Sequence, residues 1–123
     1  MPTLLDTNCI LRYLLADVPD QADLVAERIR EGAIVSPEFL SEAVYVLSGK
    51  VYGFARDEVS LSLEAFLQDV ECEHMAAMRE ALRIYLDSSL DFPDCILIAR
   101  HEVEGAPVMT FDKKLAKLVS GTA

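Results

Sequence analysis

The chain has few of the side chains that build disulfide frameworks or zinc sites, with three cysteines and two histidines in 123 residues. Cys9, Cys72 and Cys95 form no CxxC pair, and neither His74 nor His101 has a cysteine at ligand spacing. We therefore expect no structural zinc site. Because the cysteine count is odd and each cysteine has apolar neighbours, we expect small buried thiols. We expect both histidines at the surface beside helices, not as catalytic bases.

Long apolar runs are also missing. No stretch approaches the roughly 18 apolar residues that would span a bilayer. The segment Met1–Ala16 is apolar, but it has no basic start and is interrupted by Asp6 and Arg12, so we do not expect a signal peptide. We expect a cytoplasmic protein with no membrane partner. With 52% apolar and 26% charged residues, the composition predicts one compact domain over residues 1–123.

Positive charge is scarce as well. The sequence has 21 acidic and 11 basic residues, for a net charge of −10. A protein that holds nucleic acid by bulk electrostatics would be expected to be basic. An enzyme that meets phosphates through bound divalent cations is still compatible, because each cation reverses the local sign of charge. Most of the acidic residues have a simpler role, which is to keep the protein in solution.

The pattern along the chain alternates short apolar runs with longer helical ones, and there is no internal repeat or linker. We predict strands over residues 3–5, 33–35, 70–72 and 107–110. We predict helices over about residues 10–15, 22–29, 37–51, 59–67, 75–85, 91–103 and 113–118. Strands that alternate with helices imply parallel pairing through right-handed crossovers. In such sheets ligands bind beyond the carboxyl ends of the strands.

Four acidic residues fall at or near that edge of the predicted sheet. Asp6 ends the first strand, and Asp112 ends the last one. Glu42 lies about one and a half turns into the helix after the second strand, and Asp94 lies in the first turn of its own helix. Carboxylates brought together would repel one another unless protonated or metal-bound, and their oxygens suit Mg²⁺ or Mn²⁺. Such a site can hydrolyse phosphodiester bonds with metal-activated water.

Each acid also has a structural explanation when it is taken alone. Asp6 and Asp112 are both placed to cap the helices that follow them. Glu42 by itself resembles an ordinary solvated helix residue. Asp91 and Asp94 form a D-x-x-D helix start that is similar to a capping box, although that box prefers Glu or Gln at its last position. A capping role is the default for Asp91, and local physics leaves the other choices open.

The same segments resemble the PIN domain family, in particular its bacterial toxin branch of the VapC type. The resemblance covers nearly the whole chain. Four segments carry it, in this order and spacing: Leu4–Asn8 (LLDTN), Glu42, Asp91–Ala99 (DFPDCILIA) and Thr110–Asp112 (TFD).

The resemblance implies a three-layer α/β/α sandwich with a central, mostly parallel sheet of four to five strands. It also implies a Mg²⁺- or Mn²⁺-dependent endoribonuclease. The matching catalytic and metal-binding acids are Asp6, Glu42, Asp94 and Asp112. Asp91 matches an additional acid found in part of the family, and Thr110 matches a hydroxyl position with a supporting role.

Members of this branch usually form homodimers and are silenced by a small antitoxin, which commonly places a basic side chain in the acidic cleft. The resemblance therefore implies RNA, an antitoxin and a second copy of the chain as partners. One departure concerns the last short strand of the family, for which residues 117–123 are a weak candidate. Candidate RNA contacts are the basic residues Arg12, Lys50, Arg56, Arg100, Lys113 and Lys114.

Three other functions compete with this interpretation. A haloacid dehalogenase-type enzyme needs Asp-x-Asp after its first strand, but the third position here is Asn8. A phosphate-receiving regulator needs an Asp at the end of its third strand, where Glu71–Glu73 offers none. A catalytically silent PIN-like binding module would be expected to have lost one metal-binding acid. All four are present, and we therefore favour an active nuclease.

Overall fold

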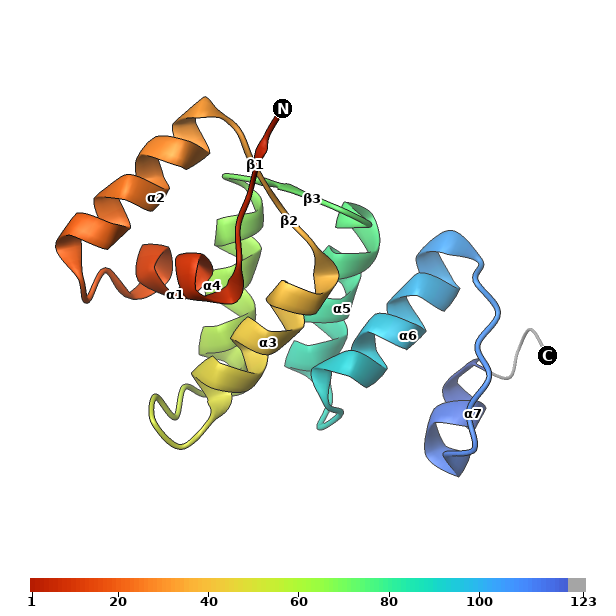
Figure 1. Ribbon diagram of the computed structural model, residues 1–123. Helices are drawn as coiled ribbons and strands as arrows, with labels where there is room; N and C mark the ends of the chain where they lie inside the picture. Colours follow the sequence, from red (N-terminus) through yellow and green to blue (C-terminus); the bar gives the residue numbers. More distant parts are fainter. Residues whose placement is uncertain (120–123) are drawn as a thin grey trace. The chain divides into compact units, whose positions relative to one another are not determined.

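A computed structural model describes residues 1–119 of the chain. The chain divides into two compact units, Met1–Met75 and Ala76–Ala123, which we call the sheet unit and the helical unit. The two are described separately below (Figure 1). Among the described residues, no helix is long and apolar enough to cross a membrane.

The sheet unit alternates strands and helices, as the sequence pattern predicts. Its strands are β1 (Thr3–Leu4), β2 (Ala33–Val35) and β3 (Glu71–Cys72), and its helices are α1 (Thr7–Leu15), α2 (Pro19–Glu31), α3 (Pro37–Ser48) and α4 (Arg56–Leu67). The strands form a parallel sheet in the order β1-β2-β3. Thr3 is opposite Ala33, and Val35 is opposite Cys72. The expected parallel α/β architecture is confirmed for this unit.

Parallel pairing brings the carboxyl ends of the strands to one edge. Asp6 follows β1, Ser36 follows β2 and Glu73 follows β3. Two of these are joined directly, because the Ser36 hydroxyl donates to Glu73 Oε1 at 2.7 Å. Ser36 therefore occupies the N-cap position of α3 without making a side-chain cap bond. The helix starts instead with proline at its first position, where the missing N–H has no cost.

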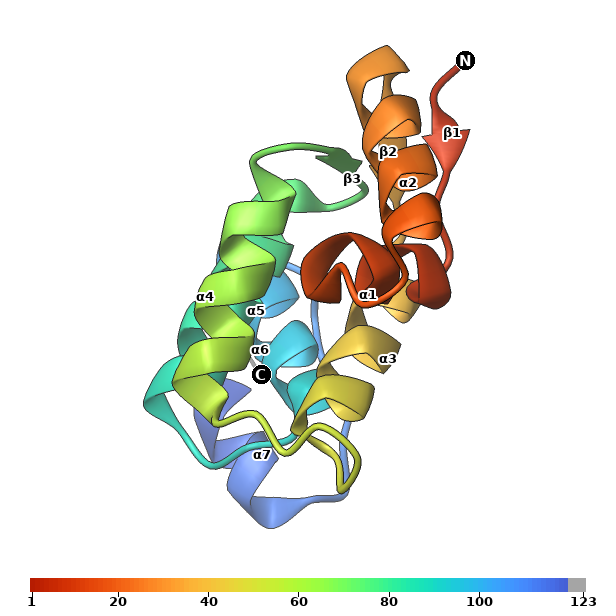
Figure 2. The same cartoon turned by 90° about the vertical axis from the view of Figure 1, so that its left-hand side faces the viewer.

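Helices α1 to α4 bury the apolar residues that their spacing predicts. Helix α1 packs against α2 and α3, and α3 packs against α4 (Figure 2). Ile10, Leu40 and Leu63 are fully buried, and the ring of Phe66 lies 5.8 Å from that of Tyr13. This core holds the amino-terminal half of α1, and with it the carboxyl edge of β1, in a defined place.

The helical unit contains α5 (Met75–Asp87), which begins at the last residue of the sheet unit, α6 (Phe92–Glu104) and α7 (Lys113–Val119). Helix α6 ends at Gly105, whose φ of 71° is the left-handed conformation that glycine adopts without strain. Ile98 of α6 and Leu115 and Val119 of α7 form a small buried cluster, against which Val108 packs.

The predicted strand over residues 107–110 was wrong, since the described structure has no strand there and its sheet has three strands instead of the expected four to five. The physical reason is that a strand needs a partner for its backbone hydrogen bonds, and the described part of the helical unit consists of helices. Pro107 also has no N–H to donate. Val108 finds its apolar contacts in the α6–α7 cluster instead.

Two smaller expectations also changed. Helix α3 ends at Ser48, before the predicted Val51, because the chain turns at Gly49. Residues 117–119, part of the weak candidate for a last strand, belong to α7, and residues 120–123 lie outside the described part of the chain. Cys72 and Cys95 are buried free thiols as expected, whereas Cys9 is only half-buried.

Candidate active site

Asp6 is exposed at the carboxyl end of β1 and is also the N-cap of α1. Its Oδ1 accepts a hydrogen bond from the backbone N–H of Cys9 at 3.0 Å. The capping role inferred from the sequence is therefore real. It does not compete with a second role, because an ionised carboxylate has about four acceptor positions and the cap uses one of them. Burial, and then the nearby Asp6 carboxylate, raise the pKa of the Cys9 thiol.

Glu42 is exposed on α3, and Thr7 links it to the start of α1. The buried hydroxyl of Thr7 lies 3.3 Å from Glu42 Oε2 and 3.2 Å from the carbonyl oxygen of Phe39. A hydroxyl has one proton, so these two acceptors share it. Thr7 is adjacent to Asp6 in the chain, and it therefore ties the two acids to one another through a single buried residue.

Asp6 and Glu42 line the same pocket, whose volume is about 520 Å³. The side of the pocket formed by α1 also contributes Asn8 and Arg12, and Tyr52 reaches it from the loop after α3. Arg12 is the one cationic residue among those that line it. The pocket therefore combines carboxylate, amide, guanidinium and aromatic groups at the carboxyl edge of the sheet, where the parallel topology predicts a ligand site.

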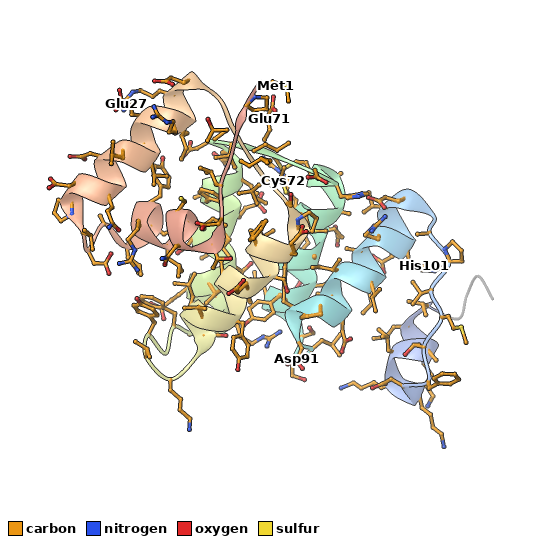
Figure 3. The ribbon with its side chains drawn as sticks, in the orientation of Figure 1. Met1, Glu27, Glu71, Cys72, Asp91 and His101 are labelled. Atoms are coloured by element: carbon orange, nitrogen blue, oxygen red, sulfur yellow. The ribbon has the colours of Figure 1, made fainter. Side chains whose placement is uncertain are left out.

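In the helical unit, Asp91 and Asp94 lie at the start of α6. Asp91 is the N-cap by position, at the end of the helix shown in Figure 3, but its side chain makes no cap hydrogen bond. Its carbonyl oxygen accepts from the backbone N–H groups of Asp94 and Cys95 at 3.1 and 3.2 Å. The D-x-x-D sequence thus starts the helix through its backbone. No described cap bond occupies the Asp91 carboxylate, which leaves it available to a ligand.

Asp112 is exposed and caps α7, with its Oδ1 accepting from the N–H of Leu115 at 2.9 Å. The hydroxyl of Thr110 accepts from the N–H of Asp112 at 3.1 Å, so Thr110 shapes the turn that presents this acid. His101 lies in the last turn of α6 (Figure 3), where its Nδ1 is 2.9 Å from the carbonyl oxygen of Ala106.

The structure thus brings Asp6 and Glu42 together in one unit and places Asp94 and Asp112 at two helix starts of the other. Within either unit taken by itself, the described residues contain no group of three or more His, Cys, Asp or Glu side chains that could hold a metal ion. A centre that uses all four acids needs both units, and it is a hypothesis that rests on the sequence pattern.

Thr7 and Tyr52 are among the pocket residues that were not assigned to the site from the sequence. Thr7 entered the sequence analysis only as part of the Leu4–Asn8 segment that carries the family resemblance, and its bond to Glu42 joins residues 35 positions apart. Tyr52 lies in the loop between α3 and α4, where no periodic pattern marks it. Arg12 was one of six basic residues named as candidate RNA contacts. The structure shows that it lines the pocket, from its position on α1.

Comparison with known protein families gives one match that covers nearly the whole chain. The family model described as PIN domain matches residues 3–120. The chain belongs to the PIN domain family. No curated protein matches it, and no solved structure does.

PIN domains are in general nucleases, which hydrolyse phosphodiester bonds and bind nucleic acid, and they generally use divalent metal ions. The pocket residues of this PIN domain fit that chemistry, because the oxygen atoms of Asp6 and Glu42 are the hard ligands that Mg²⁺ and Mn²⁺ prefer. Membership in this family favours a nuclease over the phosphoryl-transfer and regulator alternatives considered above.

Proposed function

We propose that this PIN domain is a metal-dependent endoribonuclease, formed by residues 1–123 as one nuclease domain. The observation that carries the proposal is the pocket at the carboxyl edge of β1, in which Asp6 and Glu42 lie together and are linked through Thr7. In this proposal Asp94 and Asp112 complete the set of catalytic, metal-binding acids. In the same proposal Asp91 is an additional metal ligand, and Thr110 supports Asp112.

The chemistry follows from the residues. Bound Mg²⁺ or Mn²⁺ would supply an activated water and neutralise charge on the phosphate. The acids hold the ion, and the cap bonds of Asp6 and Asp112 restrict the motion of their carboxylates. Because the net charge is −10, the protein by itself repels RNA. We therefore expect RNA binding, and not only RNA cleavage, to depend on the metal.

The first test is incubation of the purified, antitoxin-free protein with defined RNAs in Mn²⁺, in Mg²⁺ or in EDTA. We expect internal cleavage of the RNA with either metal and none with EDTA. Cleavage that persists in EDTA would refute the metal-dependent mechanism. An intact RNA in every condition, with a folded protein, would instead support the catalytically silent binding module.

The second test replaces the acids without disturbing the helix starts. Asp6→Asn and Asp112→Asn keep good N-cap residues, and Glu42→Gln keeps an oxygen to accept from Thr7. Each change, as well as Asp94→Asn, is expected to lower cleavage at least about 100-fold. Asp23→Asn on α2 is the matched control, since Asp23 is exposed and lies outside the pocket. Activity retained in Asp6→Asn would contradict the assignment.

We further propose that the protein is the toxin of a toxin–antitoxin pair, acts in the cytoplasm and forms a homodimer. The support is the resemblance to the VapC branch, together with a pocket that two acids and one arginine line. An antitoxin with a basic segment would fit such a pocket. Cell growth after expression with and without the neighbouring reading frame tests the toxin role, and the mass of the purified protein in solution tests the dimer.

A further inference from the structure

Three polar residues lie in one row at the carboxyl edge of the sheet. The N–H groups of the first residues after β1 and β3 still donate to carbonyl oxygens of β2, at 3.0 and 3.2 Å. Asp6 and Ser36 both keep extended backbone angles. The strand register therefore places Asp6, Ser36 and Glu73 level with one another, in the order of the strands that they follow. Glu73 is the acid of this row that the proposed hydrolysis does not use.

The carboxylate of Glu73 is exposed and is bound to the start of α3. The Ser36 hydroxyl donates to Glu73 Oε1 at 2.7 Å, a distance typical of a hydrogen bond to a charged acceptor. Ser36 is the N-cap residue of α3, but its side chain makes no cap bond to the helix. A contact with a residue 37 positions away thus replaces the local cap. A carboxylate at this end of a helix also interacts favourably with the helix dipole.

The backbone directly after Glu73 is strained. His74 has a φ of 56°, the left-handed conformation that is unfavourable for a residue with a Cβ atom. Such a conformation persists only where surrounding contacts compensate for its cost. The side chain of Glu73 bonds to Ser36 and its N–H bonds to the carbonyl oxygen of Val35, so both of these contacts hold the residue before the turn.

Helix α3 has a second polar contact close to its start, made by Thr7 on the β1 side of the sheet. The Thr7 hydroxyl lies 3.2 Å from the carbonyl oxygen of Phe39 and 3.3 Å from Glu42 Oε2. Because β2 lies between β1 and β3, the helix that follows β2 is contacted from both neighbouring strands. The contact from the β3 side is at Ser36, and the contact from the β1 side is within the first two turns of the helix.

Two separated contacts determine the orientation of a helix, whereas one contact leaves it free to tilt. Glu42 lies six residues after Ser36, which is roughly 9 Å along the helix axis. Apolar packing is not directional, but hydrogen bonds have a preferred geometry. The Ser36–Glu73 bond therefore limits the tilt of α3 about its contact with Thr7, and with it the movement of the Glu42 carboxylate.

We propose that Glu73 is a positioning residue of the site, which fixes the start of α3 through Ser36 and thereby keeps Glu42 beside Asp6. The inference rests on the proposed metal-dependent hydrolysis, in which Glu42 holds the ion. It adds a residue that touches neither the ion nor the RNA. Residues that orient a metal ligand from outside contribute about 10- to 100-fold to metal affinity or activity, and we expect about 10-fold here because Glu73 acts through a helix start.

The first experiment measures Mn²⁺ binding from the electron paramagnetic resonance signal of the free ion, which does not depend on cleavage. Glu73→Ala removes the acceptor and is expected to raise the Kd for Mn²⁺ about 10-fold. Glu73→Gln keeps an oxygen to accept from Ser36 and is expected to stay within about 3-fold of wild type. Equal weakening in the two variants would show that only the negative charge of Glu73 matters, and would overturn the positioning role.

Glu71→Ala is the matched control, because it removes an exposed carboxylate from the same strand. Glu71 lines a separate pocket with Met1, at the amino end of the strands (Figure 3). The Kd of this variant for Mn²⁺ is expected to equal that of wild type. A loss in Glu71→Ala as large as that in Glu73→Ala would mean that any acid of β3 has the same effect, which contradicts a specific contact with Ser36.

A double-mutant cycle tests whether Glu73 acts through Ser36. Ser36→Ala removes the hydroxyl and costs no side-chain cap bond, since the helix has none at this position. Adding Glu73→Ala to it should weaken Mn²⁺ binding no further, because the contact is already absent. Losses that multiply in the double variant would show that Glu73 acts by another route. If Glu73→Ala does not fold, Ser36→Ala breaks the same contact from the other side and takes its place.

Amide hydrogen exchange in the metal-free protein gives a readout that involves no metal ligand. The N–H groups of Phe39 and Leu40 donate to the Ser36 carbonyl oxygen at 3.1 and 3.3 Å. In Glu73→Ala these two amides should exchange about 10-fold faster, as expected for loss of one hydrogen bond to a charged group. The amides of α2 should be unchanged. Faster exchange by the same factor throughout the protein would indicate general destabilisation and would contradict a local effect on α3.

The inference and the proposed function fail in different ways. Suppose that wild type binds Mn²⁺ and cleaves RNA, while Glu73→Ala matches Glu71→Ala in metal affinity and in exchange. The positioning role is then wrong and the ribonuclease function stands. Suppose instead that the α3 amides respond to Glu73→Ala, but wild type neither binds Mn²⁺ nor cleaves RNA. The ribonuclease function is then wrong, and Glu73 has no ligand to position.

Discussion

Replacing Thr7 by valine is the most direct test of how the fold supports the site. Valine has the shape of threonine but no hydroxyl, so Thr7→Val removes the contacts to Glu42 Oε2 and the Phe39 carbonyl oxygen without opening a cavity. Because Thr7 is only 8% exposed, water cannot replace those contacts in full. Loss of one buried hydrogen bond costs about 1–2 kcal/mol. At roughly 4 °C per kcal/mol, the expected decrease in Tm is about 4–8 °C.

The same change should loosen Glu42. A residue that holds a metal ligand in place typically contributes about 10- to 100-fold to metal affinity or activity. We therefore expect Thr7→Val to need about 10- to 100-fold more Mn²⁺ for half-maximal cleavage, at a temperature where both proteins are folded. Thr7→Ser keeps the hydroxyl and is the control, since it should keep the metal requirement of wild type and lose only methyl packing.

Urea unfolding gives the stability, and cleavage against Mn²⁺ concentration gives the metal requirement. A Thr7→Val protein with unchanged unfolding free energy would show that the hydroxyl makes no net contribution to the fold. A decrease in stability with an unchanged Mn²⁺ requirement would show that Thr7 does not position Glu42. Either result would refute the reasoning from the 3.3 Å contact.

Two further predictions concern buried side chains of the sheet unit. Phe66→Ala should destabilise the protein by about 3–5 kcal/mol, measured by urea unfolding, because Phe66 is 1% exposed and packs against Tyr13 with its ring plane tilted by 59°; a loss below about 1 kcal/mol would contradict its place in the core. Burial, and then the charge of Glu73, raise the pKa of Cys72 from 9.0 to about 11. The folded state thus favours the neutral thiol, so its stabilisation is fully present below pH 9.0 and is lost as the pH rises through about 11. Iodoacetamide should therefore leave Cys72 unmodified in the folded protein at pH 8 and modify it in urea; rapid labelling of the folded protein would show that the thiol is neither buried nor protonated.

The local features of the fold follow from the sequence because they depend on nearby residues. The apolar spacing of α1 and α6, the proline at the start of α3 and the glycine after α6 all act within one or two turns of helix. The two acids that cap helices, Asp6 and Asp112, were also recognisable for the same reason. Their capping was first weighed against a role in the site, and the geometry shows that a cap bond leaves carboxylate oxygen positions open.

Predictions were less accurate where the local structure depends on a contact with a residue far away in the sequence. Residues 107–110 have the composition of a strand, but a strand forms only where another backbone offers its hydrogen bonds, and Val108 packs among helices instead. Ser36 has the position and the chemistry of a helix cap, yet its hydroxyl bonds to Glu73, 37 residues away. In both cases a long-range contact replaced the local preference.

The sequence by itself determined the alternation of strands and helices, the helix boundaries to within a few residues, and the acids that follow the strands. It also carried the resemblance to the PIN domain family. Only the tertiary structure decided which side chains share the pocket with Asp6. Thr7, Arg12, Glu42 and Tyr52 come from three separate segments, and parallel pairing of β1 and β2 with the packing of α1 on α3 brings those segments together. The apolar periodicity of a single segment does not predict which residues of other segments it will contact, because those contacts depend on how the segments pack.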